Sequence, residues 1–247
     1  MKKLKIGIVG VGSIAKVAHI CSYNGMDDVE IKAVCDIDPE KLNYDQIPTT
    51  AQKYTDYREM IQKADIDAVD ICTPNDLHSE IAVYALERGK HVFCEKPDAI
   101  SSAERKKMSE AEKKSGKTLM VMRNNRHTAG SIYLKKSIEN GEFGDIYAGR
   151  CGWIRRRGIP GKGGWFTTNS RSGGGPLIDL GVHMIDLAIY LMGNPRAVAV
   201  SGSTYRKFAE AADISDSEHS SFGEKIENGV FDVEDLAVGF IKFENGA

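Results

Sequence analysis

Short apolar runs alternate with longer helical periods along the first half of the chain. Five runs have the apolar, β-branched character of buried strands: Leu4–Val9, Glu30–Cys35, Ala68–Cys72, His91–Cys94 and Thr118–Met122. Two stretches between the later runs, 76–90 and 101–117, place apolar or charged residues at helical spacing and close near a glycine. Strands that alternate with helices predict an α/β domain, with a doubly wound parallel sheet covered on both faces.

The pattern changes after about residue 122. The remaining chain is predicted to form a helix at 131–141, a β-type run at 145–157 and a glycine-rich loop at 158–175. An apolar helix at 176–192 and two more strands at 197–208 and 236–243 follow. Long strands with few crossovers predict an α+β domain with an open, mostly antiparallel sheet. We therefore expect two domains, 1–122 and 123–247. Asn245-Gly246 signals a hairpin turn that no return strand follows, so we interpret the second domain as truncated.

Composition excludes several classes of protein. The chain is 41% hydrophobic and 28% charged, and its net charge of −2 gives no electrostatic reason to bind nucleic acid or an anionic membrane. The five cysteines form no C-x-x-C pair, which favours a reducing compartment. No apolar stretch in the sequence approaches the roughly 20 residues that a bilayer span needs. We expect a cytoplasmic protein without a membrane partner.

A glycine turn follows the first predicted strand. Gly10-x-Gly12-x-x-Ala15 has the spacing of a dinucleotide-binding turn. In that turn the first glycine permits the bend and the second lets the backbone approach a pyrophosphate, and the helix that follows, from Ser13 and Ile14, points its amides at the phosphates. The alternative is a plain structural turn. The position at the first strand–helix junction favours a nucleotide site.

Asp36 ends the second predicted strand, 21 residues after Ala15. A carboxylate at this place accepts hydrogen bonds from the ribose hydroxyls of NAD. It would repel the 2′-phosphate of NADP by on the order of 3 kcal/mol per unit charge at intermediate dielectric. No lysine or arginine lies between Asp36 and Glu40. NAD is therefore favoured over NADP, although Asp36 as a mere turn residue remains an alternative.

Two further strand ends carry polar residues. Thr73-Pro74-Asn75 makes a rigid exit from its strand, and His78 follows. The other exit is Glu95-Lys96-Pro97. Because ligands of parallel sheets bind outside the carboxyl ends of the strands, we expect all these residues except Pro97 to line the cofactor site, with Lys96 beside the nicotinamide. A lysine desolvated in a cleft suits proton exchange with a hydroxyl. The alternative is a surface salt bridge between Glu95 and a neighbouring residue, with Lys96 merely solvated. The Lys96–Pro97 bond is a candidate cis bond.

The helix predicted at 176–192 has a polar stripe. At 100° per residue, Asp179, His183, Asp186 and Tyr190 fall within about 60° of one another. The segment has no lysine, arginine or glutamate, which favours a cleft over an ordinary solvated face. Asp179 can orient the His183 ring and leave its other nitrogen as a base. Without a second histidine no metal site is predicted. Asp186 and Tyr190 are assigned to packing or domain contacts.

Four residues are weaker candidates for lining a substrate site: Asn125, Arg126, Arg155 and Trp165. In a strand at 145–157, Arg155 and Arg157 would share one face while Arg156 faces the other. A solvated edge is the alternative for this arginine run. Gly173–Gly175 would let the chain approach a ligand closely, with a flexible linker as the alternative.

Several of these segments together resemble the Gfo/Idh/MocA family of NAD(P)-dependent oxidoreductases: GVGSIA, AVCDIDPEK, ICTPNDLHSEIAVYALERGKHVFCEKP and GGGPLIDLGVHMIDLAIYLMG. The resemblance implies a Rossmann domain, an open-sheet domain, and oxidation or reduction at a hydroxyl of a sugar, polyol or cyclitol. It also implies that His183 takes the hydroxyl proton, that Asp179 supports it and that Lys96 polarises or shuttles. Family members are usually longer. Asp98 replaces a usually apolar residue, which questions local packing only.

We predict an NAD-dependent oxidoreductase in which Lys96 and His183 converge beside the nicotinamide and act on a small sugar or polyol. An NAD-binding sensor without turnover and an NAD-dependent glycosidase are the alternatives. An incomplete sheet exposes an edge that can pair. We therefore expect a homo-oligomer, either a dimer or a tetramer.

Overall fold

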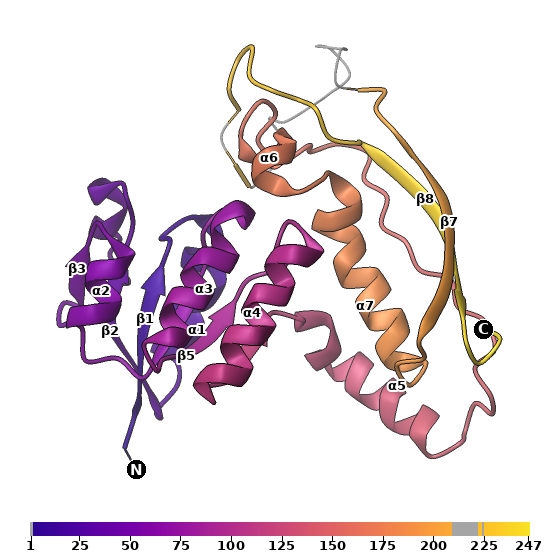
Figure 1. The fold of residues 1–247 in the computed structure, drawn as a ribbon, viewed down its shortest axis with the longest axis horizontal. Coiled ribbons are helices and arrows are strands. Elements are labelled where there is room, and N and C mark those ends of the chain that lie inside the picture. Colours follow the sequence, from indigo (N-terminus) through magenta and orange to yellow (C-terminus); the bar gives the residue numbers. More distant parts are fainter. Residues whose placement is uncertain (1, 209–221, 224) are drawn as a thin grey trace. The chain divides into compact units, whose positions relative to one another are not determined.

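The computed structural model describes residues 2–208, 222–223 and 225–247 (Figure 1). The chain divides into two compact units, one of Met1–Met122 with Ser221–Gly223 and one of Arg123–Ser220 with Glu224–Ala247. The first unit contains a parallel sheet and the second an antiparallel one.

The sheet of the first unit has six strands in the order β3-β2-β1-β4-β5-β6, all parallel. Their bounds are β1 Leu4–Val9, β2 Val29–Cys35, β3 Gln52–Tyr54, β4 Ala68–Ile71, β5 His91–Cys94 and β6 Leu119–Val121. The predicted parallel sheet is confirmed. Strand β3 was not predicted, because three mainly polar residues at the sheet edge have no apolar signature. The strand order reverses between β1 and β4, and at such a point the loops separate into a crevice that can take a ligand.

Helices connect these strands: the helical run 13–24, which contains the π-helical η1 (Ala15–Ile20) and α1 (Cys21–Asn24), then η2 (Pro39–Asn43), α2 (Tyr57–Lys63), η3 (Asn75–Leu77), α3 (His78–Glu87) and α4 (Ser102–Ser115). Side-chain caps fix two of the helix starts. The Ser101 hydroxyl accepts the Glu104 amide at 3.3 Å, and the Asp56 carboxylate accepts the Arg58 amide at 2.8 Å. Both satisfy amides that a helix start leaves without a partner.

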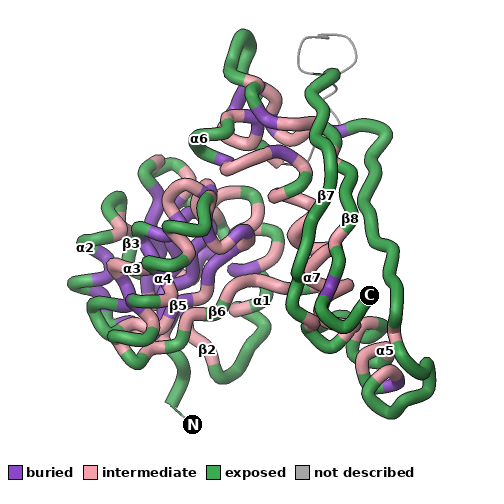
Figure 2. Tube along the Cα trace, turned by 45° about the vertical axis from the view of Figure 1, so that its right-hand side comes forward, coloured by how far each residue is buried: buried purple, intermediate pink, exposed green. Residues whose placement is uncertain are grey.

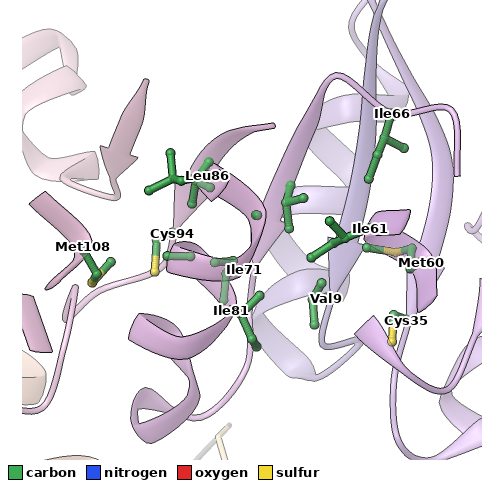
Figure 3. Packing of buried hydrophobic residues seen from close by; sticks show 14 of the residues in the cluster. Val9, Cys35, Met60, Ile61, Ile66, Ile71, Ile81, Leu86, Cys94 and Met108 are labelled. Carbon is green, nitrogen blue, oxygen red and sulfur yellow. The ribbon is translucent and has the colours of Figure 1, made fainter. Parts of the chain in front are cut away.

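Two buried clusters cover the two faces of this sheet. On one face, side chains of β1, β4 and β5 pack with those of α2, α3 and α4 (Figure 3). On the other face, Ile8, Val34 and Ile20 pack together. Burial on both faces explains why these strands are almost continuously apolar in the sequence. Most of the buried chain in Figure 2 lies in this unit.

The second unit consists of η4 (Asn124–His127), α5 (Ala129–Glu139), η5 (Trp165–Thr167), α6 (Asn169–Ser172), η6 (Leu177–Gly181), α7 (Val182–Leu191), β7 (Ala197–Tyr205) and β8 (Leu236–Phe243). Strands β7 and β8 pair antiparallel, with Tyr205 opposite Leu236. The predicted open antiparallel sheet is confirmed. The predicted turn after β8 is also present, since the Gly246 amide donates to the Phe243 carbonyl at 3.1 Å.

The predicted strand at 145–157 is wrong. These residues form no strand, and no described part of the chain pairs with them. Tyr147 and Ile154 are exposed, so their side chains have no sheet face to pack on. Residues of high β-propensity form a strand only where a neighbouring strand supplies the hydrogen-bonding ladder. Because there is no strand here, the prediction that Arg155 and Arg157 share one face of a sheet, with Arg156 on the other, is also wrong.

One helical run differs from the expectation about membranes. Among the described residues, Asn169–Leu191 is long and apolar enough to cross a bilayer by length and composition, with a mean hydropathy of 1.2. The expectation that no stretch approaches this length is therefore wrong. A single segment of this kind is weak evidence for a membrane span. This run also contains Asp179 and Asp186, and ionisable side chains are costly in hydrocarbon.

Candidate active site

The glycine turn after β1 is shaped by close backbone contact. Gly10 has a φ of +91°, and a Cβ there would lie 2.7 Å from the carbonyl oxygen of Cys72. Only glycine fits such a position. A Cβ at Gly12 would meet nothing within 4 Å. The second glycine thus borders open space, as a turn that admits a pyrophosphate requires, and Ser13 and Ile14 begin the helical run behind it.

Asp36 lies next to this turn at the end of β2. Its carboxylate accepts the Val11 amide at 2.8 Å and the Asp38 amide at 3.0 Å, and the side chain is buried. These bonds hold the carboxylate beside the glycine turn, where a ribose hydroxyl would be read. One detail corrects the charge argument: the Lys41 ammonium lies 3.8 Å from Asp36, just outside the sequence window that was considered.

The exit of β4 adjoins the same turn. A Cβ at Gly10 would lie 2.9 Å from the Thr73 amide nitrogen. The Thr73 hydroxyl is buried and has no hydrogen-bond partner within the described structure. A buried hydroxyl without a partner is costly, and a polar atom of a bound nucleotide would remove that cost. Thr73, Gly10 and Asp36 together fit a dinucleotide. Pro74 and Asn75, the latter buried, complete this exit.

His78 is turned into the protein. Its ring is fully buried, with Nδ1 2.6 Å from the Pro97 carbonyl oxygen and Nε2 2.9 Å from the Thr73 carbonyl oxygen. Burial lowers the pKa of His78, which favours the neutral ring, and a neutral ring donates to only one of the two carbonyls at a time. This histidine holds the two strand exits together from within.

Glu95 also points inward. One carboxylate oxygen lies 2.9 Å from Nε2 of His19, and the other accepts the Lys96 amide at 3.0 Å. The second ring nitrogen of His19 lies 2.7 Å from a carboxylate oxygen of Asp70. The side chains of His19, Asp70 and Glu95 are all buried. The Lys96–Pro97 bond, a candidate cis bond in the sequence, is cis.

The His19–Asp70 pair was missed in the sequence, although a signal was present. Asp70 is an acid in the middle of a strand whose four residues are all buried, and a buried acid requires a partner. His19 lies on the buried side of the first helix, four residues after Ala15. With Cys72 the pair has a spacing that could hold a metal ion. At 2.7 Å, however, the nitrogen and oxygen are at hydrogen-bond distance, shorter than the roughly 3.3 Å between two ligands of a tetrahedral zinc.

In the second unit, Asp179 lies in η6 and His183 in α7, on one continuous helical run. Both side chains are half-buried. The Glu234 carboxylate caps this run, accepting the Gly175 amide at 2.9 Å and the Leu177 amide at 3.0 Å. An anion at a helix start stabilises it through the exposed amides.

The glycine-rich loop before this helix is fixed by the protein itself. A Cβ at Gly175 would lie 1.9 Å from the Glu234 carbonyl oxygen, so the close approach made there is to backbone rather than to a ligand. The buried Thr167 hydroxyl accepts the Gly163 amide and donates to the Val230 carbonyl, both at 2.8 Å. The contacts of Gly175 with Glu234 favour an ordered turn over the flexible linker that was the alternative for Gly173–Gly175.

Asp186 and Tyr190 engage basic side chains. Arg126 donates to both carboxylate oxygens of Asp186, at 2.7 and 2.6 Å, and Arg123 donates to it at 3.2 Å. The Arg126 guanidinium also lies 4.8 Å from the centre of the Tyr190 ring. Asp186 and Tyr190 thus serve packing in this unit. The guanidinium of Arg126, a candidate substrate residue, binds the Asp186 carboxylate instead.

The other three candidates for lining a substrate site lie on three different segments of the second unit. Asn125 lies in η4 and is half-buried. Trp165 stacks on its neighbour Phe166 at 3.7 Å between ring centres. Arg155 is exposed and lies 5.2 Å from the Trp153 ring. Lys96 belongs to the first unit and His183 to the second, and their convergence stays a prediction.

Two family models match almost the whole chain. The model of the oxidoreductase family with an NAD-binding Rossmann fold matches residues 4–123, and that of the GFO/IDH/MocA C-terminal domain matches residues 132–247. The chain belongs to the Gfo/Idh/MocA family. The predictions of a family oxidoreductase and of NAD as cofactor are thereby confirmed, in agreement with the fit of Gly10, Thr73 and Asp36 to a dinucleotide.

The relatives of this chain include proteins named as sugar dehydrogenases. The chain is 34% identical to a D-glucoside 3-dehydrogenase of Escherichia coli K12, over 98% of this chain and 68% of that protein. It is 33% identical to a levoglucosan dehydrogenase of Pseudarthrobacter phenanthrenivorans, over 100% and 66%. A solved structure of a levoglucosan dehydrogenase with NADH and levoglucosan superposes with a TM-score of 0.85 at 32% identity, over 100% and 65%. The chain spans about two thirds of the length of these relatives.

Proposed function

We propose that this chain transfers a hydride between NAD and a hydroxyl-bearing carbon of a sugar, polyol or cyclitol. The observation that carries the proposal is the shared edge of the parallel sheet, where Gly10, Asp36 and Thr73 fit a dinucleotide. Lys96 follows the neighbouring strand β5 at that edge. The sugar dehydrogenases among the relatives support a carbohydrate substrate.

The chemistry divides between hydride and proton. NAD supplies the hydride acceptor: the carbon of the CH–OH group gives up its hydride and becomes a carbonyl carbon. The hydroxyl proton goes to the His183 ring, and the Asp179 carboxylate stabilises the imidazolium that results. The Lys96 ammonium donates a hydrogen bond to the substrate oxygen and favours its deprotonation. In the reverse direction, His183 returns the proton.

Turnover with a substrate panel tests this assignment. NAD reduction would be followed at 340 nm with glucosides, levoglucosan, hexoses, inositols and sugar acids. Lys96→Ala should lower kcat by about 10² or more without loss of NAD binding, because general acid–base catalysis contributes about 10²–10⁴. Lys114→Ala, at an exposed position of α4, is the matched control and should be neutral.

Three outcomes would contradict the proposal. Near-wild-type turnover in Lys96→Ala would remove the role of the lysine. Binding of NAD without hydride transfer to any compound would favour a sensor. Release of free sugar without net NADH formation would favour a glycosidase.

Assembly and location are parts of the same proposal. Two-stranded β7–β8 has edges that can pair with another copy, which supports a homo-oligomer, dimer or tetramer. Light scattering of the purified chain tests this, and a monomer at all concentrations contradicts it. All five cysteines are free, two of them exposed, which supports a cytoplasmic location. Cell fractionation tests that location.

A further inference from the structure

The Glu95-Lys96-Pro97 turn is held by buried groups at both ends. At the far end, His78 lies at hydrogen-bond distance from the Pro97 carbonyl. At the near end, the Glu95 carboxylate accepts the amide of Lys96. The position of the Lys96 backbone therefore depends on how firmly the Glu95 side chain is itself held.

His19 holds Glu95. Its ring lies between two carboxylates, with Nε2 2.9 Å from Glu95 and Nδ1 2.7 Å from Asp70, and the side chains of His19, Glu95 and Asp70 are only 2%, 8% and 1% exposed. Carboxylates accept hydrogen bonds, so both ring nitrogens donate only when the ring carries two protons. The geometry thus calls for a buried imidazolium.

The charges around the ring agree with this assignment. Burial alone would lower the pKa of His19, but its hydrogen bonds to Asp70 and Glu95 raise it to about 10. Burial alone would raise the pKa of Glu95. The pKa is nevertheless lowered from its usual value, chiefly by the hydrogen bond from His19. The other titratable groups facing the ring are neutral, because burial raises the pKa of the Tyr23 hydroxyl and of the Cys72 thiol.

The side chains of Asp70, His19 and Glu95 alternate in charge, and the last of them accepts the Lys96 amide. Without the ring, two carboxylates would lie in the interior with no cation between them, and one of them would take up a proton or turn toward water. Either change would release the Lys96 amide. A backbone shift of about 1 Å at a catalytic group can lower a rate about 10²-fold.

We propose that His19 is a positioning residue, which holds the Glu95 carboxylate between its ring and the Lys96 amide and so fixes the lysine that acts in catalysis. The inference rests on the function proposed above for Lys96. His19 contacts neither reacting atom and exerts its effect through Glu95.

His19→Gln tests the proposal in the intact chain. Glutamine keeps a similar reach but has no charge and donates from a single nitrogen. We expect kcat to fall about 10- to 100-fold, with the Kd for NADH unchanged within about threefold because Gly10, Gly12 and Asp36 keep their contacts. In a Glu95→Gln background the same substitution should lower kcat by less than about twofold, because the effects of coupled residues do not add. His91→Gln, at the opposite end of β5, is the matched control.

Amide hydrogen exchange gives a readout that does not need turnover. In His19→Gln, the Lys96 amide, which donates to Glu95, should exchange at least about tenfold faster. The Glu95 amide should keep its rate, because it donates to the Ile71 carbonyl at 2.9 Å. Glu95→Asp is the second variant: it keeps every charge but withdraws the carboxylate, and should also speed Lys96 exchange.

The outcomes separate the two proposals. Unchanged kcat and unchanged Lys96 exchange in His19→Gln overturn the role of His19. A purely structural histidine would lower the melting temperature and leave kcat and Lys96 exchange unchanged, which also overturns it. If the wild-type chain transfers no hydride to any compound, the proposed function fails, and Lys96 exchange alone decides whether His19 holds the turn.

Discussion

The two units position their candidate catalytic groups by different means. In the first unit, Lys96 follows a strand packed in a dry core, and its turn is held by buried histidines and carboxylates. In the second unit, the helix that carries Asp179 and His183 is only half-buried and is fixed at its start by Glu234. Among the buried hydrophobic side chains of the described residues, only Val233 and Phe243 belong to the second unit. Buried polar contacts order the first site, and partly exposed polar contacts order the second.

Removing a core side chain from the first unit should have the largest effect on stability. Leu86 is fully buried in the cluster of Figure 3. Leu86→Ala should lower the free energy of unfolding by about 2–5 kcal/mol, since it loses transfer energy and leaves a cavity. Urea unfolding followed by far-UV circular dichroism measures this. A loss below about 1 kcal/mol would mean that the core of the first unit is loosely packed.

Alkaline pH should affect the first unit next most strongly. The folded pKa of His19, about 10, lies above the ordinary 6.5. Its contribution to stability is therefore fully present below about pH 6.5 and is lost as the pH rises through about 10. The melting temperature of the wild type should fall between pH 7 and 10 more steeply than that of His19→Gln. Parallel curves for the two proteins would show that the ring is neutral in the folded state.

Loss of the Glu234 cap should weaken the second unit by a smaller amount. Glu234→Ala leaves the Gly175 and Leu177 amides without their acceptor and should cost about 1–2 kcal/mol. Glu234→Gln keeps one oxygen and should cost less. Both tryptophans, Trp153 and Trp165, lie in the second unit, so intrinsic fluorescence reports its unfolding. Equal losses for the alanine and glutamine variants would contradict a capping role.

The smallest effect is expected on the sheet of the second unit. Val200 in β7 is 73% exposed, in contrast with fully buried Leu86. Val200→Ala should change the free energy of unfolding by no more than about 0.5 kcal/mol, because little apolar area returns to water. Chemical denaturation of a dilute sample tests this. A loss above about 1 kcal/mol would indicate that another copy of the chain covers this sheet.

The sequence was most informative where local signals and burial agreed. The bounds of β1, β5 and β8 were predicted to the residue. A short apolar run between glycine or charged residues fits a buried strand better than other secondary structures. The candidate strand at 145–157 failed because pairing is not a local property. Apolar and aromatic residues were present there, and a partner strand among the described residues was not.

The candidate site was predictable in part for the same reason. Spacing along the chain identified Gly10, Gly12 and Asp36, whose roles depend on a single strand–helix–strand unit. The bond between His19 and Glu95 joins residues 76 positions apart, so no periodicity records it. Asp70, an acid within the buried strand β4, indicates that a partner exists but does not identify His19 as that partner.

The Glu234 cap also bears on the order in which the chain can assemble during synthesis. The six parallel strands are all present once Val121 has left the ribosome. The helical run bearing Asp179 and His183 begins near Leu177 but lacks its capping carboxylate until 57 more residues have been translated. A nascent chain can therefore close its nucleotide-binding half early, while the start of the helix that carries Asp179 and His183 stays uncapped until Glu234 emerges.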